Sequence, residues 1–198
     1  DQRLSRGLGD VYKRQPAGFS YELFLDQNGE KISKSKGNGL SIEDWLRYGN
    51  PESLALFMYG QPKRAKRLYF DLIPKTVDEF YMHNEKLNEA EPADRLENPA
   101  WHIRINQDKT STAMPVSFSL LLNLAAVCSA ETSDSLWGYI RAYAPDTSPQ
   151  AHPELDRLAT YAVQFYQDRV RPTKRYRKAT PDETVSYTHL TLPTTTIV

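Results

Sequence analysis

The sequence has little of what marks several specialised classes of protein. It contains one cysteine, Cys128, so no internal disulfide can form, which is typical of a reducing compartment such as the cytoplasm. Its histidines are scattered, and no Cys/His cluster has the spacing of metal ligands, so we expect no bound metal. The 25 basic and 25 acidic residues cancel, which excludes a global field that would attract nucleic acid. Any contact with nucleic acid must come from local patches.

Long hydrophobic runs are also missing. The most apolar stretch, residues 116–128, is too short to span a membrane and includes Ser117, Ser119 and Asn123. It predicts a buried helix, and we expect no membrane partner. With 39% hydrophobic and 25% charged residues, the composition is that of a globular protein.

Glycine is scarce, with nine in the chain, yet three of the nine surround one lysine-rich run. Residues 31–36 hold three lysines and two serines, and Gly29, Gly37 and Gly39 lie around them. Ammonium and hydroxyl groups can surround phosphate oxygens, and glycines let a backbone approach a ligand closely. Pre-placed cations also stabilise charge on a transferring phosphoryl group. The lysines alone would equally fit a solvated surface loop or a targeting run.

Elements expected on both sides place this run structurally. Residues 19–26 alternate apolar and polar positions and end on the turn sequence Asp-Gln-Asn-Gly, which predicts a strand and a tight loop. Ser41 and Asp44 form a capping box, so a helix is expected to begin there. The predicted order is strand, mobile basic loop, helix.

Lys31-Ile32-Ser33-Lys34-Ser35 resembles the KMSKS signature loop of class I aminoacyl-tRNA synthetases, with Ile32 in the methionine position. Neighbouring stretches resemble most closely the class I type of lysyl-tRNA synthetase. These stretches are residues 21–26, 45–48, 51–58, 66–71 and 114–122. The resemblance covers residues 16–184. The loop indicates a class I synthetase, and the neighbouring stretches indicate that its amino acid is lysine.

The resemblance implies ATP-dependent activation of lysine and its transfer to tRNA-Lys, with ATP bound together with Mg²⁺. Lys34, in the place of the second signature lysine, would stabilise the leaving pyrophosphate, and Lys31 would assist. Ser33 and Ser35 would give hydroxyl hydrogen bonds, and Gly37 and Gly39 would act as hinges. The ATP-binding set is then Lys31, Ser33, Lys34, Ser35 and Gly37. The HIGH signature of the family does not occur here, so the chain alone is expected to be inactive.

The expected fold is mainly α. The family's architecture implies the end of a Rossmann-type α/β catalytic domain at residues 16–60, followed by a helical stem-contact and anticodon-binding region at 61–184. Helices are predicted over residues 42–48, 51–60, 75–89, 115–128 and 132–143, and from 153 to before Pro172. Residues 91–109 are expected to be a long connection with an extended piece at 101–105.

The two ends of the chain are interpreted as non-native flanks, residues 1–15 and 185–198. A DNA segment that can encode residues 10–15 has a reverse complement that encodes residues 185–189. One segment in opposite orientations at both ends resembles a transposon end used as a sequencing adapter, so these residues are excluded from the fold prediction.

Two basic clusters are candidates for tRNA contact, because lysines and arginines supply salt-dependent phosphate contacts. The first comprises Lys63, Arg64, Lys66 and Arg67, and a solvated linker helix is an equal alternative for it. The second comprises Arg171, Lys174, Arg175 and Arg177, with Arg169, Lys178 and a candidate stacking residue, Tyr176. Its charges could instead complement the end of the preceding helix.

Four aromatic residues at helical spacing favour a core role over base stacking: Trp137, Tyr143, Tyr161 and Phe165. Two other functions stay open. One is another class I synthetase, for instance the glutamate type, and the other is a non-catalytic helical RNA-binding module.

Overall fold

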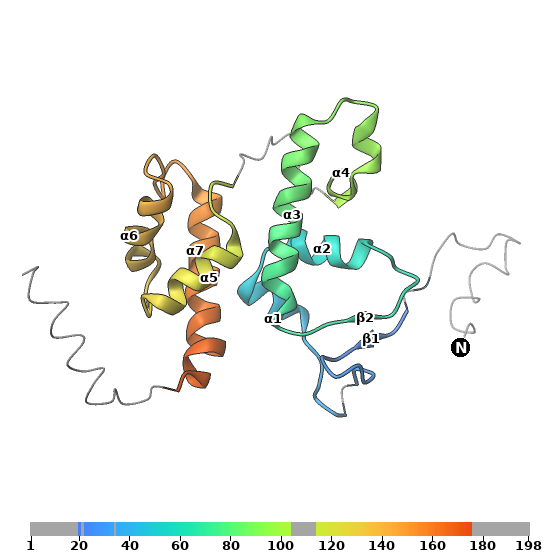
Figure 1. Ribbon diagram of the computed structural model, residues 1–198. Helices are drawn as coiled ribbons and strands as arrows, with labels where there is room; N and C mark the ends of the chain where they lie inside the picture. Colours follow the sequence, from blue (N-terminus) through green and yellow to red (C-terminus); the bar gives the residue numbers. More distant parts are fainter. Residues whose placement is uncertain (1–19, 21, 34, 104–113, 176–198) are drawn as a thin grey trace, which may run out of the picture.

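A computed structural model describes residue 20 and residues 22–33, 35–103 and 114–175. Within them the protein is mainly helical, as predicted (Figure 1). A short strand pair and the first two helices form one side of the molecule, and a long helix, α3 (Leu72–Glu89), lies between them and a group of three helices (Figure 1). No helix in these residues is long and apolar enough to cross a membrane.

The sheet of the described chain is small and parallel. β1, Phe24–Leu25, pairs with β2, Lys66–Arg67, in the register Phe24↔Lys66 and Leu25↔Arg67. The strand is therefore much shorter than the predicted 19–26, of which residues 19 and 21 lie outside the described residues. The pairing also joins the two sides of the boundary predicted after residue 60, and residues 66–67 are strand, which corrects the linker-helix alternative.

Helices α1 and α2 begin where their caps predict. α1, Ile42–Tyr48, has the capping box of Ser41 and Asp44, with the Ser41 hydroxyl accepting from the Asp44 amide at 3.0 Å. α2, Pro51–Tyr59, is capped by Asn50. The two helices are joined by a buried hydrogen bond in which Trp45 Nε1 donates to Ser53 Oγ at 3.1 Å.

Helix α3, Leu72–Glu89, carries the predicted buried face and begins three residues earlier than expected. Its buried residues include Val77, Phe80, Tyr81, Asn84 and Leu87. An aliphatic first turn, with Ile73 fully buried, extends the helix toward β2.

The extended piece expected at 101–105 is wrong for residues 101–103. A 3₁₀ turn at Asp94–Glu97 leads into α4, Pro99–Ile103. Asn98 explains the difference, because its Oδ1 accepts from the Ala100 amide at 2.9 Å and its Nδ2 donates to the His83 carbonyl at 2.8 Å. An asparagine cap followed by proline is a helix start. Residues 104–105 lie outside the described residues.

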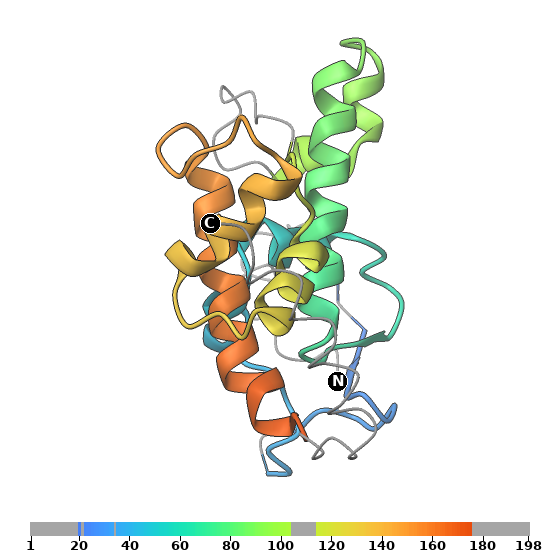
Figure 2. The same ribbon diagram turned by 60° about the vertical axis from the view of Figure 1, so that its left-hand side comes forward.

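The remaining helices, α5 (Phe118–Val127), α6 (Ser133–Tyr143) and α7 (Pro153–Phe165), pack together, with α5 also against α3 (Figure 2). α5 begins three residues after the predicted Pro115, since Ser117 is its cap and Asp78 of α3 accepts from the Phe118 and Ser119 amides at 2.6 and 3.1 Å. Asp78 thereby joins α3 to the start of α5.

The helix that starts at Pro153 does not end cleanly. α7 continues into a π-helical turn, Tyr166–Val170, and then a 3₁₀ turn, Arg171–Thr173. Of the four aromatics predicted for the core, Trp137 and Phe165 are buried and Tyr161 is half-buried. Tyr143 is 61% exposed, which corrects its core assignment. It is the last residue of α6, so the helical face that buries Leu136 and Ile140 ends before it can cover this ring.

Candidate functional site

The lysine-rich run leaves the sheet through a tight hairpin. The Asp26 amide donates to the Glu30 carbonyl at 2.8 Å, and the Ile32 amide donates to the Phe24 carbonyl at 3.0 Å. Gly29 takes φ = +86° at the turn, a conformation that L side chains rarely adopt. The predicted order of strand, loop and helix is present, and the hairpin fixes where the loop begins.

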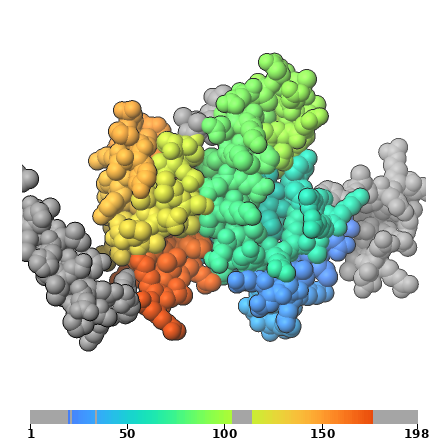
Figure 3. Space-filling model, viewed as in Figure 1, coloured from blue at the N-terminus to red at the C-terminus, as the bar shows by residue number. Residues whose placement is uncertain are grey.

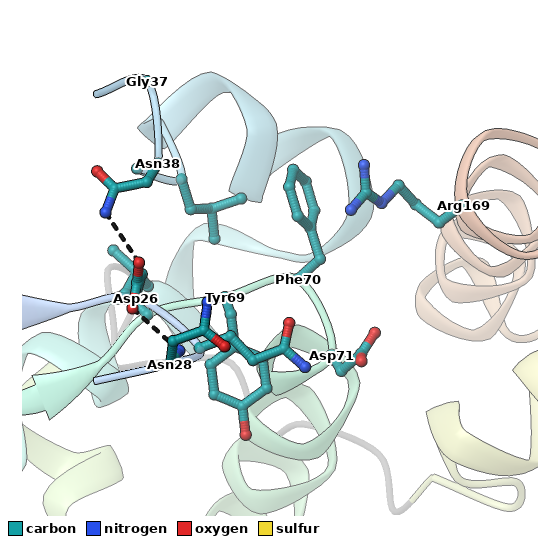
Figure 4. Close-up of a pocket in the computed structure, with 12 residues that line it drawn as sticks. Asp26, Asn28, Gly37, Asn38, Tyr69, Phe70, Asp71 and Arg169 are labelled. Carbon is teal, nitrogen blue, oxygen red and sulfur yellow. Dashed lines mark hydrogen bonds between the residues drawn. The ribbon is translucent and has the colours of Figure 1, made fainter. Parts of the chain in front are cut away.

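Asp26 is the centre of the hairpin and is nearly buried, at 9% exposure. Its Oδ1 accepts from the Asn28 and Glu30 amides at 2.9 and 2.8 Å. Its Oδ2 accepts from Asn38 Nδ2 at 2.9 Å (Figure 4). The hydrogen bond from Asn38, with those from the backbone, holds the pKa of Asp26 below its usual value. This carboxylate is therefore charged at neutral pH.

Asn38 connects the end of the loop to the hairpin through its side-chain hydrogen bonds. Its Oδ1 accepts from the Ser33 amide at 3.1 Å, and its Nδ2 also lies 3.4 Å from the Lys31 carbonyl oxygen. The Gly37 amide donates to the Ser33 carbonyl at 3.2 Å, with Gly37 at φ = +62°. The two ends of the run are therefore held together across the hairpin.

The serines predicted to bind ATP face one another. Ser33 Oγ lies 3.3 Å from Ser35 Oγ and accepts from the Lys36 amide at 3.3 Å. Both hydroxyls are thus near the tip of the turn. Gly37 has the left-handed backbone that suits a hinge, but Gly39 does not have it. A Cβ on Gly39 would lie 2.7 Å from Ile32 Cγ2, so close packing requires glycine there.

The three lysines of the run differ in environment. Lys31 is exposed. Lys36 pairs with Glu30 at 3.0 Å on the surface, and this carboxylate raises the pKa of Lys36. Lys34, the principal predicted catalytic residue, lies outside the described residues.

A pocket of about 260 Å³ opens beside the loop (Figure 4). Gly37, Asn38 and Asp26 form one side, and Phe70 and Arg169 lie on another. The Arg169 guanidinium lies 3.8 Å from the centre of the Phe70 ring. Sequence reasoning placed Arg169 in the second basic cluster and missed its place beside the loop, because no local pattern indicates that the end of α7 reaches residue 70.

The first basic cluster is divided by the structure. Lys66 points inward, where its ammonium donates to the carbonyls of Phe57, Met58 and Gly60 at the end of α2, and burial lowers its pKa. The ammonium of Lys66 therefore has a structural role that competes with the predicted tRNA contact. Lys63, Arg64 and Arg67 are exposed.

The second basic cluster is divided in the same way. Lys174 is half-buried and donates to the Ala126 carbonyl and, at 3.3 Å, to the Tyr166 hydroxyl. Arg171 is exposed and lies 4.0 Å from Glu131, and Arg175 is exposed. Arg177, with Tyr176 and Lys178, lies outside the described residues. The end of α7 and the loop lie at the same end of the molecule, along the lower edge of Figure 3.

Across the described ranges no group of three or more His, Cys, Asp or Glu side chains could hold a metal ion. The lysines and serine hydroxyls of the loop suit an anionic, phosphate-bearing ligand. The pocket beside the loop has mixed charge, because the carboxylates of Asp26 and Asp71 line it together with the guanidinium of Arg169.

Comparison with known proteins gives a consistent result. Residues 8–107 match the family described as tRNA synthetases class I (K). The match begins inside the flank assigned to adapter sequence, so the boundary at residue 15 stays a prediction. The chain is 51% identical over 177 residues to the lysine–tRNA ligase of Roseobacter denitrificans, covering 89% of this chain and 33% of that protein. It is 48% identical over 164 residues to that of Rickettsia rickettsii, covering 82% and 31%.

The chain thus spans about a third of the length of the curated relatives it matches. No solved structure matches it. The identities are high, and they extend over most of the described helices as well as the loop. The family match together with these relatives confirms the resemblance inferred from residues 31–35 and their surroundings, and the chain belongs to the class I tRNA synthetases (K).

Proposed function

We propose that the chain supplies the signature-loop half of the active site of a lysine–tRNA ligase. In the reaction, a lysine carboxylate attacks the α-phosphate of ATP, giving lysyl-adenylate and pyrophosphate. A hydroxyl of the terminal ribose of tRNA-Lys then attacks the lysyl carbonyl of the adenylate, which forms the ester and releases AMP. The observation that carries the proposal is the loop itself: a lysine- and serine-bearing turn held by Asn38 between a parallel strand and a capped helix.

Within this site we assign Lys34 to the leaving pyrophosphate and Lys31 to an assisting contact. Ser33, Ser35 and Gly37 lie at the tip of the turn, where hydroxyl and amide groups can meet phosphate oxygens. Cations and donors placed before the reaction stabilise the charge that develops in the transition state. ATP is proposed to enter with Mg²⁺ bound to its phosphates.

We further propose that residues 16–60 belong to the end of a Rossmann-type catalytic domain. The parallel pairing of β1 with β2 supports such a domain and extends it to residues 66–67. The helices that follow are proposed to contact tRNA. Exposed residues of both clusters carry this proposal: Lys63, Arg64, Arg67, Arg171 and Arg175. Lys66, Lys174 and Arg177 stay in the predicted set, although the ammonium groups of the first two already have backbone partners.

The test uses a chimera in which this chain replaces the matching third of the Roseobacter denitrificans lysine–tRNA ligase. ATP–pyrophosphate exchange and charging of tRNA-Lys are measured with lysine. Replacing Lys34 by Ala should slow exchange by about two to three orders of magnitude, the usual scale for one transition-state donor. Replacing Lys36 by Ala is the matched control, since Lys36 is paired with Glu30 on the surface, and its effect should stay below about tenfold.

Two results would contradict the proposal in different ways. Equal turnover with Lys34→Ala would remove this lysine from the mechanism. An inactive chimera that still binds tRNA in a salt-dependent way would favour a binding module.

A further inference from the structure

The loop is tied at both ends by one pair of side chains, Asp26 and Asn38, called here the Asp26–Asn38 clamp. Asp26 precedes the hairpin turn and Asn38 follows the loop, so the hydrogen bond closes the chain between two residues that lie twelve positions apart. On the loop side, the amide group of Asn38 reaches the backbone of Lys31 and of Ser33. The clamp therefore holds the chain on both sides of Ile32.

The hydrogen bonds of the clamp are directional and charge-assisted. Two backbone amides and Asn38 Nδ2 donate to the Asp26 carboxylate at 2.8 to 2.9 Å. Bonds to an ionised carboxylate are shorter and stronger than bonds between neutral groups. Because Asp26 is nearly buried, water competes weakly for these donors. Asp26 can thus hold Asn38 in one orientation, with its Oδ1 toward Ser33.

The hairpin turn has hydrogen bonds that do not involve Asn38. The hairpin at Gly29 is closed by its own backbone hydrogen bonds and by the two amides on Asp26 Oδ1. What Asn38 adds is a connection from this hairpin to the Ser33 amide, one residue before Lys34. The clamp thus acts on the position of the loop, whereas the fold of the hairpin is secured separately.

We propose that Asp26 and Asn38 are positioning residues for the lysines of the signature loop. The clamp fixes the backbone at Lys31 and Ser33, so that the lysine side chains are already placed to contact the transferring phosphate when ATP binds. The inference rests on the proposed function. Neither residue is assigned contact with substrate. A displacement of about 1 Å at a reacting group can cost about a hundredfold in rate, so a positioning pair can matter as much as a contact.

The chemistry of the pair allows a test in which the two side chains are swapped between positions 26 and 38. In Asp26→Asn, one side-chain oxygen can still accept the two backbone amides, but the new NH₂ group faces the NH₂ group of Asn38. In Asn38→Asp, two carboxylates face each other. In the double variant, the amide at position 26 can donate to the carboxylate at position 38, which can still accept from the Ser33 amide. Each single variant breaks the clamp, and the double variant restores its central hydrogen bond.

In the chimera described above, each single variant should lower kcat for ATP–pyrophosphate exchange by about 10- to 100-fold, with the KM for lysine unchanged. The double variant should recover kcat to within about fivefold of the unsubstituted chimera. Asp44→Asn is the control, because Asp44 makes comparable hydrogen bonds in a purely structural capping box. It should lower thermal stability without changing kcat.

A second measurement uses the 198-residue chain alone. Hydrogen exchange of the Ser33 amide should be about tenfold faster in each single variant and should slow again in the double variant. Unchanged exchange in both single variants would overturn the clamp. Lower kcat in the single variants without recovery in the double variant would also overturn the proposal, because it would assign each residue a separate role.

The two measurements distinguish a failure of the clamp from a failure of the proposed function. An unsubstituted chimera that fails to activate lysine overturns the proposed function, and with it the catalytic part of this inference. In that case, hydrogen exchange of the Ser33 amide still shows whether the clamp holds the loop. The expected hydrogen exchange together with unaltered kcat in the single variants would reduce the clamp to a structural contact and overturn the positioning role.

Discussion

The Tyr48 hydroxyl donates to Asp168 Oδ2 at 3.1 Å, joining two residues that lie 120 positions apart. Arg47 pairs with the same carboxylate oxygen at 2.8 Å. Tyr48 ends α1, the helix that follows the signature loop, and Asp168 lies in the π-helical turn just before the second basic cluster. One carboxylate therefore links the loop side of the molecule to the end of its helical region.

We expect Tyr48→Phe to lower the free energy of unfolding by about 1 kcal/mol, because it removes one hydrogen bond and keeps the ring in place. The ring itself packs edge-on against Phe165 and Phe70. Urea denaturation of Tyr48→Phe, Asp168→Ala and the double variant gives the coupling energy. Tyr139→Phe, at a tyrosine that is 50% exposed, is the control and should be neutral. Additive effects of the two substitutions would show that the contact contributes nothing.

Replacement by methionine should lower stability at Lys66 and tRNA affinity at Lys63. Lys66→Met leaves the carbonyls at the end of α2 without their ammonium donor and should lower the free energy of unfolding by about 1 to 2 kcal/mol. Lys63→Met should leave stability unchanged and reduce tRNA affinity in the chimera, with a salt slope smaller by about one. Equal stability losses for the two variants, or a tRNA effect confined to Lys66→Met, would contradict this division.

Gly39→Ala should destabilise the loop because the added Cβ would lie 2.7 Å from Ile32 Cγ2. The expected cost is about 1 to 3 kcal/mol, the range for overpacked sites. Ile32→Met removes the β-branch and with it Cγ2, so Gly39→Ala should cost less in that background. Thermal unfolding of the two single variants and the double variant checks this. An unchanged cost in the Ile32→Met background would place the strain elsewhere.

Tyr81 should make the protein less stable at high pH. Burial, and then the nearby Glu154 that its hydroxyl contacts at 3.2 Å, raise the pKa of Tyr81 above its ordinary value. The stabilisation is complete below the unfolded pKa of about 10 and is lost as pH rises toward the folded value. The free energy of unfolding should therefore fall above pH 10 by up to about 1.4 kcal/mol per pH unit from this group. Tyr81→Phe should show a shallower decline, and an identical slope would exclude this residue.

Local signals in the sequence predicted the features that local chemistry decides. Ser41 with Asp44, Asn50 with Pro51, and Thr132 mark helix starts that the structure confirms. A cap satisfies its own helix, so no distant partner is needed to form it. The helical character of the chain and its lysine-bearing loop were predictable for the same reason.

Features that depend on distant partners were not predictable. The ammonium of Lys66 turns inward because the end of α2 lies beside β2, and Arg169 joins the pocket because α7 returns to Phe70. Asp78 caps α5 from another helix and shifts its start. The prediction of an extended piece at 101–105 was wrong for a different reason. Asn98 followed by Pro99 is a local helix cap, but the irregular pattern of polar residues around it did not indicate a helix.

The π-helical turn at Tyr166–Val170 sets the direction in which the 3₁₀ turn Arg171–Thr173 continues from α7. A π turn accommodates one residue more than an α turn, and each residue advances a helix by about 100°. Removing one residue here, for example Gln167, would restore the α-helical count and turn Arg171 to a different side of the molecule. The direction in which the chain presents Arg171 is thus encoded in a single extra position, and a length change there would alter that direction without altering the charge.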